Sequence, residues 1–549
     1  MMDLTRRELA ILLSATALRA KPTEPDLILL NGVIHTMDPA NPDATAVAIA
    51  DGRFLAVGSN SEISAFATSR TKRVDLGNFP VLPGFIDGHM HVAMSGLEHL
   101  KSVDADLPSI AAIKNAVHKR AQQTPAGEWV LGFKYDDTKM AEGRPINRTD
   151  LDEASPDHPV FITHRGGHTA FVNSAALNKA DINDKTPDPK GGAYEHDASG
   201  KLTGRIMDRG TEPFRTKIPF TATRAERREG VKLITQMLVR AGVTSAHDAG
   251  GSPTDLLAYQ DAYESGDLHA RVYCLIRNPH IDKMIAAGIR TGLGNEWVRV
   301  GAMKLMLDGS ISERTARLSQ PYVGRPNDFG IQIMGEEEMY TWARKAHLAG
   351  WQVASHANGD GVIDMALRVY ERLQRETPRS DPRFRLEHCT VINEGLVRRI
   401  KAIGAIPTPF SSYALYHGEK LNAYGPERVN HMFALRSFLD AGVPATQASD
   451  YTASPFDPMM ALQSEVTRMD KTGTVWGPKQ RITIQEAVRV GTINGAYASF
   501  EENIKGGIIP GKVADLVVFG RDPFREDPSK LIGIPVQRTM VGGKWMFES

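Results

Sequence analysis

Short apolar runs alternate with helical stretches along most of the chain. Each run is continuous rather than alternating, which is typical of parallel strands buried on both faces. Helical patterns lie between them, such as Arg224 to Ala241 and Glu336 to Ala349. The eight strand-like runs are Val81 to Ile86, Val243 to His247, Arg271 to Ile276, Val298 to Leu307, Trp351 to Ser355, Phe384 to Glu387, Ala402 to Pro407 and Val443 to Ala448. They predict an α/β fold, a distorted TIM-like (β/α)8 barrel with its chemistry at the carboxyl ends of the strands.

The two ends of the chain have a different pattern, in which short strands are separated by turn residues. These strands are Leu27 to Leu30, Val33 to Met37, Ala46 to Ala50 and Phe54 to Gly58 at one end, and Ala514 to Phe519 and Arg538 to Trp545 at the other. We predict a small β-sandwich built from residues 24–80 and 505–549, with the barrel over residues 81–504.

One connection in the predicted barrel is too long for a strand–helix crossover. About 150 residues separate His91 from Gly242, where a crossover needs a small fraction of that length. The segment contains both helical and strand-like stretches. We therefore expect an inserted subdomain at about residues 100–220, placed over the barrel mouth.

The first 23 residues resemble an export signal of the twin-arginine type. Arg6-Arg7 precedes the apolar run Leu9 to Leu18, which is too short to span a bilayer. We expect a periplasmic, exported protein, and the alternative is a short amphipathic helix on a cytoplasmic protein. No other segment has the pattern of a membrane span.

Composition and charge narrow the class of protein. The 549 residues carry 65 Lys and Arg against 65 Asp and Glu, so the formal net charge is zero. This balance argues against nucleic acid as a partner. The candidate site described below makes a small-molecule substrate the expected partner. The two cysteines, Cys274 and Cys389, exclude a disulfide framework. The composition does not exclude a homodimer.

Histidines at the ends of apolar runs predict a metal site. His89 and His91 are two residues apart, so on a strand both side chains point to one face. His356, His388 and Asp450 each end or closely follow a later run. Imidazoles and a carboxylate at successive strand ends suit a divalent metal, with zinc expected and manganese, iron or nickel also compatible.

Lys304 lies inside an apolar run, where an ammonium group is costly unless it is paired or modified. Carboxylation would turn it into an anionic carbamate able to bridge two cations. The alternative is a buried ion pair with Asp308 or Asp450.

Together these motifs resemble those of the amidohydrolase superfamily, in the branch that includes N-substituted formamide deformylases (amidohydrolase family 3). The matching segments are residues 84–91 (GFIDGHMH), Lys304, His356, His388, Asp450, residues 492–496 (TINGA) and residues 507–515 (GIIPGKVAD). Two further marks of the branch are residues 167–174 (GHTAFVNS) and residues 304–310 (KLMLDGS).

The resemblance implies a distorted barrel with a small β-sandwich, and a site with one or two divalent ions. It implies that His89 and His91 bind the first ion, that carboxylated Lys304 bridges, and that His356 and His388 bind the second. Asp450 would ligate the first ion and act as the catalytic proton shuttle.

Three further residues are candidates for substrate binding. His168 follows two glycines in the insertion, and Asp308 and Arg314 follow Lys304 on an expected mouth loop. A solvated loop histidine is the alternative for His168. Strand alternation predicts that Glu387 and Cys389, which flank His388, point away from the site.

The function expected from these residues is metal-dependent hydrolysis of a non-peptide carbon–nitrogen bond in a small amide, N-formyl or cyclic amide substrate, by metal-activated hydroxide. Alternatives on the same site are ester hydrolysis, deamination and decarboxylation. A non-catalytic metal-binding or regulatory protein is the alternative from a different class.

Overall fold

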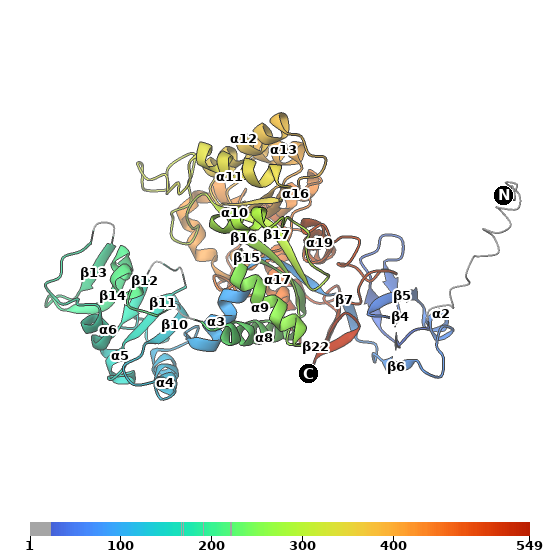
Figure 1. Cartoon of the computed structure of the whole chain (residues 1–549), viewed down its shortest axis with the longest axis horizontal. Coiled ribbons are helices and arrows are strands. Elements are labelled where there is room, and N and C mark those ends of the chain that lie inside the picture. Colours follow the sequence, from blue (N-terminus) through green and yellow to red (C-terminus); the bar gives the residue numbers. More distant parts are fainter. Residues whose placement is uncertain (1–23, 166, 168, 190–191, 220–221) are drawn as a thin grey trace, which may run out of the picture.

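A computed structural model describes residues 24–165, 167, 169–189, 192–219 and 222–549. The expected export signal lies outside the described residues. A central barrel carries one lobe on each side, as Figure 1 shows. One lobe is an insertion between the first two barrel strands, and the other contains both ends of the described chain.

Seven parallel strands form the wall of the barrel. In spatial order they are β8 (Phe85–Met90), β15 (Val243–Gly251), β16 (Arg271–Arg277), β17 (Val298–Met306), β18 (Val353–Ala357), β19 (Arg385–His388) and β20 (Ile406–Thr408). The eighth run is not a regular strand, but it still fills the gap. The Thr446 amide donates to the Pro407 carbonyl (3.1 Å), and the Gly88 amide donates to the Gln447 carbonyl (2.8 Å). The predicted barrel is confirmed.

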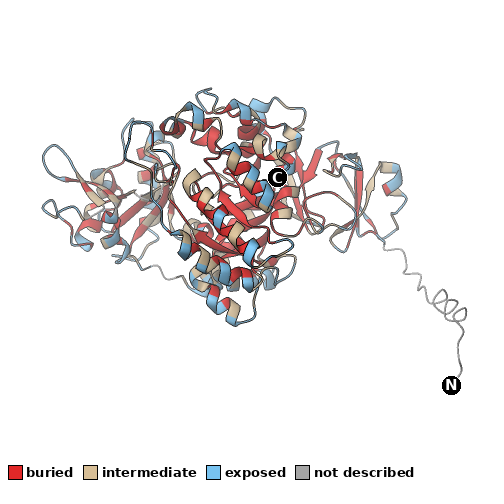
Figure 2. Ribbon diagram, turned by 90° about the horizontal axis from the view of Figure 1, so that it is seen from above, coloured by how far each residue is buried: buried red, intermediate tan, exposed pale blue. Residues whose placement is uncertain are grey.

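Amphipathic helices cover the outside of the barrel. Those around the wall include α3 (Val92–Lys101), α8 (Arg224–Arg240), α9 (Pro253–Glu264), α11 (Glu336–Leu348), α12 (Asp360–Glu376), α13 (Glu394–Ile403) and α17 (Pro458–Thr467). In α12, for example, Val362, Ala366 and Leu373 are buried at helical spacing while the opposite face is charged. Figure 2 shows the buried strands beneath helices whose outer faces are exposed. In the described residues, no helix has the length and apolar character needed to cross a membrane.

The lobe formed by the chain ends contains two sheets. One has the order β5-β4-β1-β6 and comprises β1 (Leu27–Leu30), β4 (Ala46–Ala50), β5 (Arg53–Gly58) and β6 (Lys72–Asp75). The other has the order β23-β22-β21-β7-β2-β3 and comprises β2 (Val33–His35), β3 (Asp43–Ala44), β7 (Pro80–Pro83), β21 (Leu516–Phe519), β22 (Val536–Val541) and β23 (Lys544–Glu548). Leu29, Val47 and Leu516 share one buried cluster, so both chain ends build the predicted sandwich.

The expected strand from Val81 to Ile86 is in fact two strands that belong to different parts of the molecule. Residues up to Pro83 form β7 in the terminal sheet, whereas β8 begins the barrel at Phe85. Gly84 lies at the crossing, where an added Cβ would come within 2.2 Å of the Thr244 hydroxyl. The apolar run is continuous because both strands are buried, so hydropathy does not mark the break.

The insertion forms a six-stranded mixed sheet of its own. Its order is β13-β14-β12-β11-β10-β9, with β9 (Val103–Asp104), β10 (Val130–Tyr135), β11 (Val160–His164), β12 (Thr169–Val172), β13 (Gly192–His196) and β14 (Leu202–Asp208). One buried cluster includes Ile113 of α4 (Ile110–Ala121) and Leu151 of α5 (Arg148–Ala154), and another includes Leu177 of α6 (Ser174–Lys179). Helices therefore supply apolar side chains to two separate cores within this lobe.

A buried ion pair joins the barrel to the terminal sandwich. Arg271, at the start of β16, donates to both carboxylate oxygens of Asp515 (2.8 and 2.9 Å). The Gly542 amide donates to the same carboxylate (2.8 Å), and both charged side chains are almost fully buried. Burial penalises either charge alone, so each depends on the other.

We predict that Asp515→Ala lowers the free energy of unfolding by about 3–5 kcal/mol, because it leaves the Arg271 guanidinium buried without its partner. Denaturant unfolding monitored by far-UV circular dichroism provides the measurement. Asp157→Ala, at an exposed position in the insertion, is the control and should change stability by less than about 0.5 kcal/mol. An effect of Asp515→Ala as small as that of the control would contradict this account of the pair.

Candidate metal centre

A cavity of about 450 Å³ opens at the carboxyl ends of the barrel strands. Six of its lining residues are the expected ligands, namely His89, His91, Lys304, His356, His388 and Asp450. His89 lies in β8 and His91 follows it directly. The others lie in β17, β18 and β19 or, for Asp450, just after the irregular eighth segment. Barrel closure thus brings together side chains that are as far as 361 positions apart in sequence.

His89, His91 and Asp450 form the tightest group. One oxygen of Asp450 lies 3.4 Å from His89 Nε2 and 3.2 Å from His91 Nε2. One potential ligand atom from each of the three lies within 4.8 Å of the other two, which is compatible with a single cation. The backbone sets this geometry, because the Asp450 amide donates to the His89 carbonyl (2.7 Å).

The other three residues lie beside this group. The ring of His388 is 4.6 Å from that of His89 and 4.5 Å from that of His356, measured between centroids. Lys304 Nζ lies 3.4 Å from His89 Nε2. Lys304 thus lies at the centre of the cluster rather than at its rim.

Burial sets the protonation of these groups. It lowers the pKa of His356 to about 3, that of Lys304 to about 8 and that of His388 well below its ordinary value. Burial alone would raise the pKa of Asp450, but hydrogen bonds with His89 and His91 hold it well below its ordinary value. Neutral imidazoles and an ionised carboxylate are the forms that bind metal.

His388 has a free ligand atom, and Lys304 lacks an anionic partner among the described residues. His388 Nδ1 is buried without a hydrogen-bond partner, although buried imidazole nitrogens are normally paired. Lys304 is 1% exposed and makes no ion pair within 4.0 Å among the described residues. The ion pair that would explain a buried lysine, with Asp308 or Asp450, is therefore not formed. This donor set fits a divalent metal.

A charged layer beneath the cluster orients His89. Glu387 accepts a hydrogen bond from His89 Nδ1 and pairs with Arg385, whose Nε lies 2.6 Å from it. Arg385 also donates to the Gly88 carbonyl (2.6 Å). Burial would raise the pKa of Glu387, but the Arg385 charge holds it well below its ordinary value. Such a carboxylate–histidine contact leaves His89 Nε2 free for a metal.

The prediction that Glu387 points away from the site is therefore wrong. Arg385 and Glu387 face the barrel interior, and alternation would turn His388 outward. His388 instead has a φ of +70°, which ends the alternation and returns its ring to the cavity. The signal in the sequence is the spacing of two charges, two residues apart, inside an apolar run. Cys389 is a buried free thiol.

The three candidates for substrate binding have different placements. Asp308 is fully buried and accepts hydrogen bonds from the backbone amides of Arg317, Asn358 and Gly359 at 2.9–3.0 Å, so it braces the loops behind His356. Arg314 is exposed. His168 lies outside the described residues.

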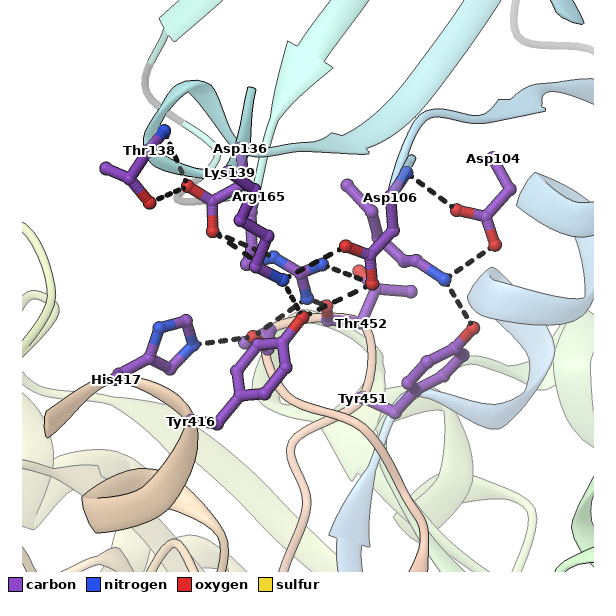
Figure 3. Close-up of polar contacts among 12 residues, drawn as sticks. Asp104, Asp106, Asp136, Thr138, Lys139, Arg165, Tyr416, His417, Tyr451 and Thr452 are labelled. Atoms are coloured by element: carbon purple, nitrogen blue, oxygen red, sulfur yellow. Dashed lines mark hydrogen bonds and ion pairs between the residues drawn. The ribbon is translucent and has the colours of Figure 1, made fainter. Parts of the chain in front are cut away.

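The insertion contacts the loop that follows Asp450, as Figure 3 shows. Arg165 is paired with Asp106 (2.7 Å) and donates to the carbonyls of Thr452 (3.3 Å) and Ala453 (3.4 Å). Lys134 lies 3.2 Å from the Tyr451 hydroxyl. The barrel holds the same loop from below, since the His91 amide donates to the Tyr451 carbonyl (3.1 Å).

A closed parallel barrel with this cluster at its mouth has the architecture of a metal-dependent hydrolase. The chain belongs to the amidohydrolase family, whose model matches residues 72–547.

Known relatives agree with this assignment. The chain is 29% identical to the N-substituted formamide deformylase of Arthrobacter pascens, over 95% of this chain and 98% of that one. It is 30% identical to the protein LONG AFTER FAR-RED 3 of Arabidopsis thaliana, over 95% of this chain and 91% of that one. A crystal structure of an uncharacterised metal-dependent hydrolase from Pyrococcus furiosus has a TM-score of 0.73 and 25% identity, covering 91% and 100% of the two chains.

We predict that Glu387→Gln weakens metal binding by about 10–100-fold, because it removes the charge that orients His89 and balances Arg385. Metal content per chain, measured by mass spectrometry after dialysis against graded chelator, tests this. Glu338→Gln is the matched control on the exposed face of α11. Equal metal retention in Glu387→Gln and wild type would show that Glu387 has no part in holding the ligands.

Proposed function

We propose that this protein hydrolyses a carbon–nitrogen bond in a small amide, N-formyl or cyclic amide substrate, with Asp450 as the proton shuttle. The observation that carries the proposal is the position of Asp450. One carboxylate oxygen lies against His89 and His91, while the side chain keeps 18% of its surface exposed to the cavity. A group placed there touches both the cation site and any substrate in the cavity.

The proposed ligands are His89, His91 and Asp450 for one ion and His356 and His388 for a second, with Lys304 between them. When bound, divalent cations lower the pKa of a water and polarise a substrate carbonyl. Zinc is the ion we propose, because imidazole and carboxylate donors suit it. The relatives' names support hydrolysis and metal dependence, and the formamide deformylase in particular supports a carbon–nitrogen bond.

Asp450 performs the step on which amide cleavage depends. A new bond forms between the water oxygen and the carbonyl carbon, and the proton released from the water passes to Asp450. Asp450 then delivers a proton to the nitrogen as the carbon–nitrogen bond breaks, so the amine leaves neutral. Without this proton transfer the nitrogen would have to leave as an amide anion, which is a poor leaving group. The products are an acid and an amine.

We predict that Asp450→Asn retains bound metal at near wild-type stoichiometry and loses turnover by at least about 10²–10⁴-fold, because an amide side chain can ligate but cannot carry the proton. Metal analysis and a panel of N-formyl amines, amides, lactams and esters provide the two measurements. Asp157→Asn is the control at an exposed site. Wild-type rates in Asp450→Asn would refute the shuttle. Bound metal in the wild type without turnover of any substrate would favour the regulatory alternative.

We also propose that Lys304 is carboxylated. Carbon dioxide reacts with the neutral amine, a nitrogen–carbon bond forms and one proton leaves. The resulting carbamate is an anion, and it would remove the cost of burying an unpaired ammonium group among imidazoles.

We predict one carbamate per chain, seen by ¹³C NMR after the metal-loaded protein is incubated with ¹³C-bicarbonate. The signal should be absent in Lys304→Arg, because a guanidinium does not form a carbamate under these conditions. The exposed Lys530→Arg serves as the control and should keep the signal. A metal-loaded wild-type protein without this resonance would rule out carboxylation.

A further inference from the structure

Arg277 is a cation that lines the cavity beside the candidate metal ligands. It ends β16, its Cα pairs in register with that of Lys304, and it lines the cavity with the six candidate ligands. Among the described residues it makes no hydrogen bond or ion pair through its side chain, and its Nε is buried and unsatisfied. A guanidinium that is partly removed from water normally finds an anion or a carbonyl.

The acidic groups around the cavity are already engaged. Asp255 lies 3.3 Å from Arg227, and Asp248 accepts a hydrogen bond from the Tyr259 hydroxyl (2.6 Å). Asp450 is held by His89 and His91. None of these carboxylates forms an ion pair with Arg277 among the described residues, so its positive charge faces the cavity, and cations in the metal site would add to this charge.

Apolar side chains also line the cavity. Met94 and Leu97 of α3 and Met306 at the end of β17 face the same cavity, and Met94 is 44% exposed. An exposed methionine at the edge of a polar cavity provides an adaptable surface for an apolar group. One molecule that fits all three features carries an amide for the metal site, an anion for the guanidinium and an apolar side chain.

We propose that Arg277 binds the carboxylate of the substrate, and that the substrate class is N-formyl or N-acyl amino acids with an apolar side chain. This inference rests on the proposed amide hydrolysis and adds to it the identity of the substrate. A guanidinium binds a carboxylate through two parallel N–H···O bonds, which fixes orientation as well as charge. That contact would position the amide bond over the metal site.

A different role for Arg277 would be to polarise the carbonyl that is attacked. The two roles predict different effects of an Arg277 substitution on the hydrolysis of a neutral substrate. A carboxylate-binding arginine matters only for substrates with a carboxylate, whereas a carbonyl-polarising arginine matters for every amide.

The test uses two substrates that differ only in the carboxylate, N-formyl-L-leucine and N-formyl-3-methylbutylamine, on the metal-loaded full-length enzyme. We expect the wild type to prefer N-formyl-L-leucine in kcat/KM by about ten- to hundredfold. Arg277→Met should remove this preference mainly through KM and leave the neutral substrate within about threefold of wild type. Arg277→Lys should restore part of it. Arg344→Met, on the exposed face of α11, is the matched control and should behave as wild type.

Direct binding separates failure of this inference from failure of the proposed hydrolysis. Calorimetry with metal-loaded Asp450→Asn measures the affinity for both compounds without turnover, and the Asp450→Asn, Arg277→Met double variant shows whether metal alone attracts the carboxylate. Tighter binding of N-formyl-L-leucine that disappears in the double variant supports the inference even if neither compound is hydrolysed. Three results would overturn the inference that Arg277 binds the carboxylate. They are hydrolysis of both compounds without a preference, an equal loss on both substrates in Arg277→Met, and a preference that survives this substitution.

Discussion

The structure depends on one geometric constraint, the closure of a parallel barrel. Parallel strands end at the same edge, so closing the sheet brings the last residue of each strand to one mouth. The eighth segment is irregular, yet its hydrogen bonds to Pro407 and Gly88 complete the wall. Asp450 follows directly on that segment, and its distance from His89 is a consequence of this closure. A barrel left open at this point would separate the carboxylate from the imidazoles.

The interior also contains charged side chains, and two buried ion pairs balance most of this charge near the barrel wall. Glu387 and Arg385 form a fully buried pair beneath His89, and the Arg271–Asp515 pair ties the outer wall to the terminal sandwich. Each pair is tolerated because both charges are present together. Lys304 and Arg277 differ from these groups, since neither has an anionic partner among the described residues. Both of these cations line the cavity.

The insertion contributes to the site through the loop after Asp450. Arg165 and Lys134 contact residues 451–453 from one side, while the backbone of β8 and His91 holds the same loop from the other. The insertion is thus connected by hydrogen bonds to the loop that directly follows Asp450.

The sequence by itself determined the barrel, the sandwich from both chain ends and the identity of the metal-ligand candidates. These follow from local signals, because buried strands are continuous apolar runs and ligands at their ends interrupt them. It did not determine where β7 ends and β8 begins, since both strands are equally apolar on either side of Gly84. Nor did it place Glu387, because the positive φ of His388 breaks the alternation on which the prediction relied. Only the tertiary structure decided that Arg277 has no ion-pair partner among the residues described, because pairing depends on which strands become neighbours.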